Sequence, residues 1–173
     1  MITDDSRVTA EVNALSADQF VDRFGFLFEH SPWIVAAAAH RRPFADMAAI
    51  EAALAGVLEA ATPNQRLALI RAHPELAGKA AIDKTLTEAS TQEQASAGLD
   101  RLSPMEFDQF HALNDAYRAR FGFPFIICVR LTDKAGILAQ MQARLGHDRE
   151  TEIAAACDEI GKIVHLRLME ALT

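Results

Sequence analysis

The chain has 173 residues, of which half are hydrophobic and 24% are charged. This length can enclose one well-filled core, and the composition shows no break, so we expect a single domain over residues 1–173. The net charge of −7 leaves no basic face for a polyanion, which argues against nucleic acid as a partner. No apolar run is long enough for a membrane span, and the polar, acidic amino terminus is unlike a signal peptide. We therefore expect a cytoplasmic protein with no membrane partner.

Known motifs for metal and nucleotide chemistry do not occur in the chain. The two cysteines, Cys128 and Cys157, lie far apart in apolar segments, which predicts buried thiols rather than a disulfide or a zinc site. The six histidines show neither HxH nor HExxH spacing, and there is no phosphate loop, dinucleotide fingerprint or G-x-S-x-G elbow. The sequence therefore offers no basis for a metal ion.

Helices are expected through most of the chain, because alanine is abundant and β-branched residues are sparse. Capping residues and hydrophobic spacing predict helices over residues 17–29, 33–40, 46–60, 63–72, 134–145 and 148–172. Two more are predicted, one that starts near Thr87 or Ser90 and is closed by Gly98, and one that starts at Pro104 and includes Tyr117. We expect Trp33 and Tyr117 to anchor the core. The fold class that follows is all-α, a single compact multi-helix domain.

One stretch, residues 121–129 (FGFPFIICV), has the pattern of a buried strand. No second strand is visible to pair with it, and an isolated strand cannot satisfy its backbone. We therefore interpret the stretch as an extended buried loop whose N–H and C=O groups need another partner. A bound ligand is one candidate for that partner.

A histidine lies where the fourth predicted helix must end. Pro74 disfavours helical geometry at the preceding residue, so His73 should leave the helix in an extended conformation. The carboxyl end of the helix dipole favours the imidazolium form, which can supply a proton. The structural alternative is a capping hydrogen bond, and this segment by itself favours that alternative.

Arg167 interrupts the apolar stripe of the last helix. The stripe runs through Ile153, Cys157, Ile160 and Val164 in steps of four and three, and its next position is the arginine. A charge on a core-facing position needs a carboxylate partner. A structural role, either an internal salt bridge or a side chain that snorkels to solvent at the end of the stripe, and an anion clamp for a ligand explain this position equally well.

A polar cluster, Ser90-Thr91-Gln92-Glu93-Gln94, offers groups that could hydrogen-bond a small heterocycle rich in N–H and C=O groups. The structural alternative is a helix amino terminus with a solvated face, in which Ser90 and Glu93 form a capping box. Taken alone, the cluster favours this alternative.

Several segments, taken together and in this order, resemble the 2-oxo-4-hydroxy-4-carboxy-5-ureidoimidazoline (OHCU) decarboxylase family of purine catabolism. The matching segments are Ser31-Pro32-Trp33, His73 to Gly78, Ser90 with Glu93-Gln94, Ala97-Gly98-Leu99, Leu113-Asn114 with Tyr117, Arg120 to Phe125, Glu159-Ile160 and Arg167-Leu168. The resemblance implies an all-helical homodimer that needs neither a metal nor an organic cofactor. Two departures are Glu75, where the family more often has Asp, and the alanine-rich segment after Trp33, which lacks a glutamate often found there.

The family's functional positions carry over one at a time as implications of this resemblance. The catalytic histidine falls on His73, with Pro74 lining the substrate pocket. Glu93 becomes catalytic or orienting, and Gln94 holds the ring. The implied substrate-binding residues are Pro74, Ser90, Thr91, Gln92, Glu93, Gln94, Phe125, Ile126, Ile127, Cys128, Val129 and Arg167, with the loop residues acting through backbone groups.

The resemblance thus implies decarboxylation of OHCU to (S)-allantoin in urate degradation, with His73 as the general acid/base and a small-molecule ureide as the partner. A non-catalytic helical module that binds a ureide, or serves an interaction, is the main alternative. A hydrolase that acts on a neighbouring ureide is a third possibility. The presence of His73, Ser90, Glu93, Gln94 and Arg167 together favours the enzyme.

Overall fold

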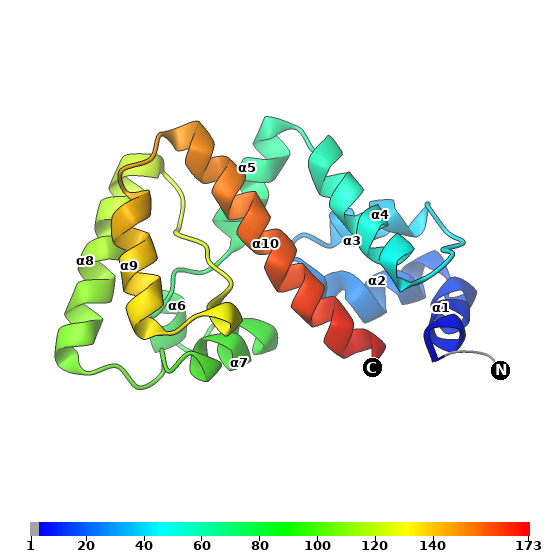
Figure 1. The fold of residues 1–173 in the computed structure, drawn as a ribbon, viewed down its shortest axis with the longest axis horizontal. Coiled ribbons are helices and arrows are strands. Elements are labelled where there is room, and N and C mark those ends of the chain that lie inside the picture. Colours follow the sequence, from blue (N-terminus) through cyan, green and yellow to red (C-terminus); the bar gives the residue numbers. More distant parts are fainter. Residues whose placement is uncertain (1–3) are drawn as a thin grey trace. The chain divides into compact units, whose positions relative to one another are not determined.

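The computed structural model describes residues 4–173, and every regular element in that range is a helix (Figure 1). The α-helices are α1 (Asp4–Ala14), α2 (Ala17–Phe24), α3 (Pro32–Ala39), α4 (Met47–Ala60), α5 (Pro63–Ala72), α6 (Lys79–Ile82), α7 (Glu88–Ser96), α8 (Pro104–Phe121), α9 (Lys134–Arg144) and α10 (Arg149–Leu172). Two 3₁₀ helices, η1 (Gly25–Leu27) and η2 (Val129–Leu131), complete the set. The all-α prediction is confirmed.

The chain divides into two compact units. The first contains the residues up to Leu69 together with Gly161–Thr173, and the second contains Ile70–Ile160. The division falls inside α5 and inside α10, so each of these helices contributes residues to both units. The single domain expected over residues 1–173 stays a prediction.

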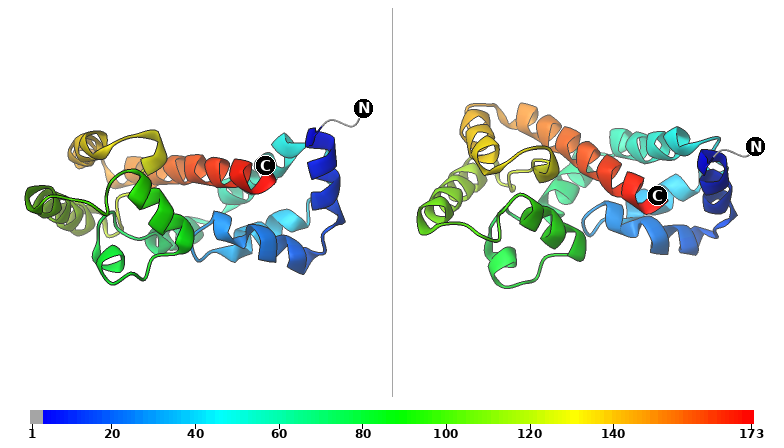
Figure 2. Two further views of the ribbon diagram at one scale, coloured as in Figure 1. Left: turned by 90° about the horizontal axis from the view of Figure 1, so that it is seen from below. Right: turned by 60° about the horizontal axis from the view of Figure 1, so that its bottom comes forward.

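In the first unit, α3 packs against both α2 and α4, and α1 packs against α4 (Figure 2). Phe20 lies at the centre of the apolar contacts, with its ring centroid 4.9 Å from that of Phe24 and 6.0 Å from that of Phe44. Asn13 fixes the backbone at Phe44, because its side-chain amide both donates to the Phe44 carbonyl and accepts from the Phe44 N–H. Hydrophobic packing therefore forms the core of this unit, and a matched polar contact fixes the backbone at its edge.

In the second unit, α8 and α9 lie side by side (Figures 1 and 2). Tyr117 of α8 is fully buried, and its ring contacts those of Phe121, Phe123 and Phe125 at centroid distances of 4.6, 5.9 and 5.4 Å. Tyr117 and Phe121 belong to the last turns of α8, and Phe123 and Phe125 lie in the segment that follows it. The extended segment 122–128 is thus packed against the helix that precedes it, and the predicted buried loop is confirmed.

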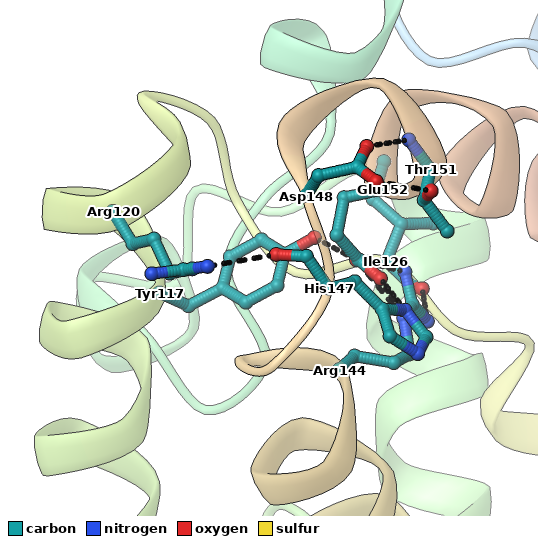
Figure 3. A network of polar contacts seen from close by, with 8 residues as sticks. All are labelled: Tyr117, Arg120, Ile126, Arg144, His147, Asp148, Thr151 and Glu152. Atoms are coloured by element: carbon teal, nitrogen blue, oxygen red, sulfur yellow. Dashed lines mark hydrogen bonds and ion pairs between the residues drawn. The ribbon is translucent and has the colours of Figure 1, made fainter.

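A buried carboxylate organises the polar side of this unit (Figure 3). Glu152, in the first turn of α10, has no exposed surface, and Arg144 at the end of α9 donates to it from Nε at 3.0 and 3.2 Å. The Tyr117 hydroxyl donates to the same carboxylate, and His147 Nδ1 lies 2.8 Å from its Oε1. Burial alone would raise the pKa of Glu152, but the hydrogen bonds from Arg144 and Tyr117 outweigh it and hold that pKa below its ordinary value.

Most predicted helix boundaries are confirmed within two residues, because the capping residues act as expected. Ser16 caps α2 in a capping box with Gln19, and Ser103 does the same for α8 with Glu106. Gly122 ends α8 with a φ of 77°. The helix predicted over 17–29 is shorter, since α2 gives way at Gly25 to the 3₁₀ turn η1.

Three features differ from the sequence-based expectation. Helices α1 and α6 were not predicted, since α1 buries little beyond Val8 and Val12 and α6 has only four residues. Trp33 was expected in the core but is 36% exposed at the start of α3.

Over residues 4–173, no helix is long and apolar enough to span a membrane.

The lowered pKa of Glu152 predicts that stability is lost in acid. Because the unfolded carboxyl titrates near its ordinary pKa of 4.5, the unfolded state binds a proton first as the pH falls. The stabilisation is therefore complete above about pH 5 and disappears as the pH drops through the folded-state pKa. We expect urea unfolding between pH 7 and pH 3 to show this fall in wild-type protein and a shallower one in Glu152→Gln.

At pH 7 the Glu152→Gln variant should be less stable by about 3–5 kcal/mol, because Arg144 keeps a buried charge without its partner. Glu150→Gln, at an exposed position in the same helical turn, is the matched control and should retain the wild-type pH dependence. A wild-type acid profile in Glu152→Gln would show that the carboxylate does not contribute in this way.

Candidate active site

The candidate site is built on the turn that follows α5. Helix α5 ends at Ala72, so His73 lies outside it, as Pro74 predicts. The His73 N–H donates to the Ile70 carbonyl at 3.2 Å, and the residue is 8% exposed. A histidine that is almost buried at the end of a helix is thereby confined to a narrow range of positions.

Backbone geometry in this turn depends on a close approach between two residues. Ala77 adopts a φ of 51°, in the left-handed region, and Gly78 follows it. A Cβ on Gly78 would lie 2.7 Å from the Cβ of Glu75, a distance that side chains do not tolerate. Glu75 has little freedom to move away, because its carboxylate pairs with Arg118 of α8. The turn is therefore tight, and Gly78 is required at its end.

Two side-chain amides from different helices hold the turn in place. Gln94 of α7 accepts from the Ala77 N–H at 3.0 Å through Oε1, and its Nε2 donates to the Glu75 carbonyl at 3.4 Å. Asn114 of α8 donates to the Leu76 carbonyl at 2.9 Å. Since the turn is neither helix nor strand, these amides supply partners that its buried backbone would otherwise lack. They fix the conformation of the segment that begins with His73.

The polar cluster on α7 is split between a buried and an exposed face. Ser90 and Gln94, one helical turn apart, are buried, and Glu93 beside them is half-buried. Thr91 and Gln92 are exposed, and their side chains donate hydrogen bonds one turn back along the same helix. Thr91 donates to the Thr87 carbonyl, and Gln92 donates to the Glu88 carboxylate. Thr87, whose hydroxyl accepts from the Ser90 N–H, caps the helix. The capping-box alternative for Ser90 and Glu93 is therefore wrong, because the helix begins three residues earlier.

The extended segment obtains backbone partners from protein side chains. The Ile126 carbonyl accepts from Arg144 Nη1 at 2.8 Å, and the Cys128 N–H donates to Glu159 Oε2 at 2.7 Å. An N–H makes one strong hydrogen bond, so the Cys128 N–H is committed to Glu159. The sequence suggested a ligand as a partner for the backbone of this segment. At the Ile126 carbonyl and the Cys128 N–H the partner is instead a protein side chain, so a ligand would bond to other backbone groups of the segment.

Cys128 marks the point where three elements come together. Burial raises the pKa of its thiol, and the negative charges of Glu159 on α10 and Glu93 on α7 raise it further. Helix α7 also packs against η2, which begins at Val129. Helix α7 therefore contacts the histidine turn through Gln94 and packs against the 3₁₀ helix that begins at the end of the loop.

Arg167 belongs to the first unit and has an internal partner. It is 3% exposed, and its Nη2 donates to Glu29 Oε1 at 3.0 Å. Its Nη1 donates to the carbonyl of Phe26 at 3.0 Å. Of the explanations that the sequence leaves open, the structure shows the internal salt bridge, and the burial of Arg167 contradicts a side chain that snorkels to solvent. Binding of a ligand anion by Arg167 stays a prediction.

Two residues of this site were not singled out individually by the sequence. Asn114 and Glu159 appeared only within matching segments, and neither carries a local signal of its contact with a distant turn or loop.

Both cysteines lie outside any disulfide in the described range, with Cys128 buried and Cys157 half-buried. Across residues 4–173 there is also no group of three or more His, Cys, Asp or Glu that could hold a metal ion.

The close approach at Gly78 can be tested against a second glycine. Gly78→Ala should lower the free energy of unfolding by about 1–3 kcal/mol, because the added methyl group collides with Glu75 in a packed turn. Gly161→Ala is the matched control, since a Cβ there meets nothing within 4 Å inside α10. It should instead add roughly 0.5–1 kcal/mol, as alanine favours helix over glycine. Urea unfolding measures both, and equal effects would contradict the packing argument.

Comparisons with known proteins bear on the whole chain. The model of the OHCU decarboxylase family matches residues 13–169. A 2-oxo-4-hydroxy-4-carboxy-5-ureidoimidazoline decarboxylase from Haloferax volcanii is 42% identical over 160 residues, which are 92% of this chain and 93% of that protein.

Two crystal structures are similar in fold. One, of (S)-allantoin synthase, superposes with a TM-score of 0.75 at 25% identity, covering 94% of this chain and 53% of the other, so this chain spans about half of that protein. The second, of OHCU decarboxylase in the presence of (S)-allantoin, has a TM-score of 0.71 at 20% identity and covers 87% and 97% of the two chains. The family match and the identity with the Haloferax volcanii protein extend over nearly the whole chain, and the chain therefore belongs to the OHCU decarboxylase family.

Proposed function

We propose that this protein decarboxylates OHCU to (S)-allantoin, a step of urate degradation, and that His73 is the general acid/base. The observation that carries the proposal is the nearly buried His73 on a turn held by Gln94 and Asn114, in a chain that matches the family over residues 13–169. A nearly buried histidine that follows a helix end and begins a fixed turn has a defined backbone position, which supports its use in proton transfer.

The proposed reaction does not need a cofactor to accept electrons, because the substrate itself contains a group that can accept them. The departing carboxylate of OHCU is attached to a carbon that also bears a hydroxyl group, beside an imine-like centre. When the bond to CO₂ breaks, its electron pair moves toward that centre and leaves an enediol-like intermediate. One proton is then delivered to a single face of the intermediate to give (S)-allantoin. Holding the charged groups and controlling that proton are the tasks left to the protein.

His73 can perform the proton steps, and the neighbouring residues of α7 support it. We assign His73 to the hydroxyl proton or to protonation of the new centre, and Glu93 to the orientation or charge of the histidine. Gln94 has a double role in this proposal. The turn uses one of the two hydrogens of its amide nitrogen, and the other can reach the ureido or ring groups of the substrate.

Residues Phe125–Val129 complete the proposed binding surface, together with Pro74 and Ser90. Because the Cys128 N–H is bonded to Glu159, the substrate would use other backbone groups of this loop. We further propose that Arg167 attracts the anionic substrate. That role rests on the charge that a guanidinium always carries, which the family resemblance places at this position.

Replacement of His73 tests the central assignment. His73→Asn should reduce kcat at least about 100-fold, the usual contribution of a general acid/base, while the protein remains folded. Turnover of freshly generated OHCU is followed by CO₂ release and by the circular dichroism of the optically active product. The matched control is His165→Asn, an exposed histidine of α10 paired with Glu51, which should keep wild-type turnover.

The same assay separates the alternative functions. Optically active (S)-allantoin appearing together with CO₂ supports the decarboxylase. Binding of the substrate without turnover would indicate the non-catalytic module, and ring opening without CO₂ would indicate the hydrolase. A folded His73→Asn protein with the wild-type rate and stereochemistry would overturn the role of His73.

The family resemblance also supports a homodimer that works without a metal or organic cofactor. We expect sedimentation equilibrium to give twice the mass of the 173-residue chain. Exhaustive dialysis against EDTA should leave kcat unchanged, because none of the proposed steps needs a Lewis acid. Loss of activity that returns when a metal ion is added would refute this part of the proposal.

A further inference from the structure

The loop Phe125–Val129 rests on one buried arginine. Arg144 Nη1 donates to the Ile126 carbonyl at 2.8 Å, and its guanidinium lies over the Phe125 ring, 4.3 Å from the centroid. The arginine is 5% exposed, so water does not compete strongly for these contacts. One side chain thus fixes both a backbone group and a ring at the start of this loop.

The arginine is itself held from the opposite side. Its Nε and Nη2 face the Glu152 carboxylate, with Nη2 2.9 Å from Oε2 (Figure 3). Tyr117 donates to the same carboxylate, and burial and the Glu152 charge raise the pKa of its hydroxyl far above the ordinary range, so it remains a donor. The planar guanidinium therefore bridges a fixed carboxylate and the loop carbonyl.

We infer that Arg144, oriented by Glu152, is a positioning residue for the reaction, which sets the Phe125–Val129 loop in the conformation that binds substrate. The inference rests on the proposed function for its catalytic consequence. Replacing a buried ion pair by uncharged residues of similar volume often changes stability little, so stability alone is a weak reason for this cluster. Precise placement of a substrate-binding loop is a stronger one.

A comparison within the segment supports this role. Arg149 donates to the Phe121 carbonyl at 3.1 Å and lies over the Phe123 ring, 5.6 Å from the centroid. It therefore makes the same two kinds of contact as Arg144. However, Arg149 is exposed, and the residues that it contacts precede the proposed binding residues in the chain. Arg149 is the natural control, since removing it takes away an arginine–carbonyl bond without touching the Phe125–Val129 loop.

The decisive variant is the double substitution Arg144→Met with Glu152→Gln. It removes the donor to Ile126 without leaving an unpaired buried charge, which a single Arg144→Met substitution would do. We expect a thermal midpoint only moderately below that of wild type, because the Ile126 carbonyl loses its donor but no buried charge is left unpaired. We also expect faster hydrogen exchange in peptides that cover residues 125–129 and a kcat/KM lowered about 10- to 100-fold. We also expect a lower excess of the (S) product, because a displaced loop no longer exposes only one face of the intermediate.

Arg149→Met should keep both the exchange of residues 125–129 and the kcat/KM of wild type. Arg144→Lys supplies a second variant should the double substitution fold poorly. A lysine ammonium can reach one acceptor but does not reproduce the planar fork, so partial recovery of kcat/KM is expected. Wild-type exchange in this loop together with wild-type kcat/KM, in a folded Arg144 variant, would overturn the inference.

Failure of the proposed function has a different signature. If wild-type protein does not release CO₂ from OHCU, the proposed reaction is wrong, but hydrogen exchange of the loop still tests whether Arg144 fixes the loop.

A third result would overturn only the catalytic part of the inference. In that case wild-type protein is active and the loop in the double variant exchanges faster, but neither kcat/KM nor the (S) excess changes. Arg144 would then hold the loop without contributing to catalysis.

Discussion

The backbone around the candidate site is buried but irregular, and its N–H and C=O groups therefore need side-chain partners. In the His73–Gly78 turn these partners are the amides of Gln94 and Asn114. In the Phe125–Val129 loop they are Arg144 and Glu159. A buried backbone group without a partner is costly, so each such side chain limits the segment to one conformation. Both segments are thus held with a rigidity that secondary structure normally provides.

Helix α7 connects these two irregular segments. Gln94 faces the turn, while the charge of Glu93 acts on Cys128 of the loop. The same helix packs against η2, which begins at the last residue of the loop. The proposed proton-transferring residue and the proposed binding surface are therefore both placed against α7, although residues 93 and 94 lie far from residue 128 in the sequence.

Charged groups in the interior are matched by several partners each. Glu152 receives donors from Arg144 and Tyr117, and in the first unit Arg167 has both the Glu29 carboxylate and backbone carbonyls. Such clusters contribute modestly to net stability, because desolvation opposes the attraction between the charges. Their effect is mainly geometric, since a guanidinium satisfied at several N–H groups has few alternative rotamers.

The sequence by itself determined the local features of this protein. Pro74 ended α5 before His73, Ser16 and Ser103 capped their helices, and the lone apolar run without a partner strand became a buried loop. These features depend on backbone geometry and on neighbours within a few residues, which a sequence displays directly. The resemblance added the site residues that local physics left ambiguous.

Only the tertiary structure decided which polar side chains meet. The sequence allowed Ser90 to cap a helix, but Thr87 is the residue that caps it. The position of Arg167 in the sequence was compatible with both a salt bridge and a ligand clamp, and the folded chain places Glu29 beside it. Asn114 contacts a turn 38 residues away, and Arg144 reaches a carbonyl 18 residues before it. Contacts of this kind depend on how helices pack, and the spacing of residues along a single helix carries no information about its partner.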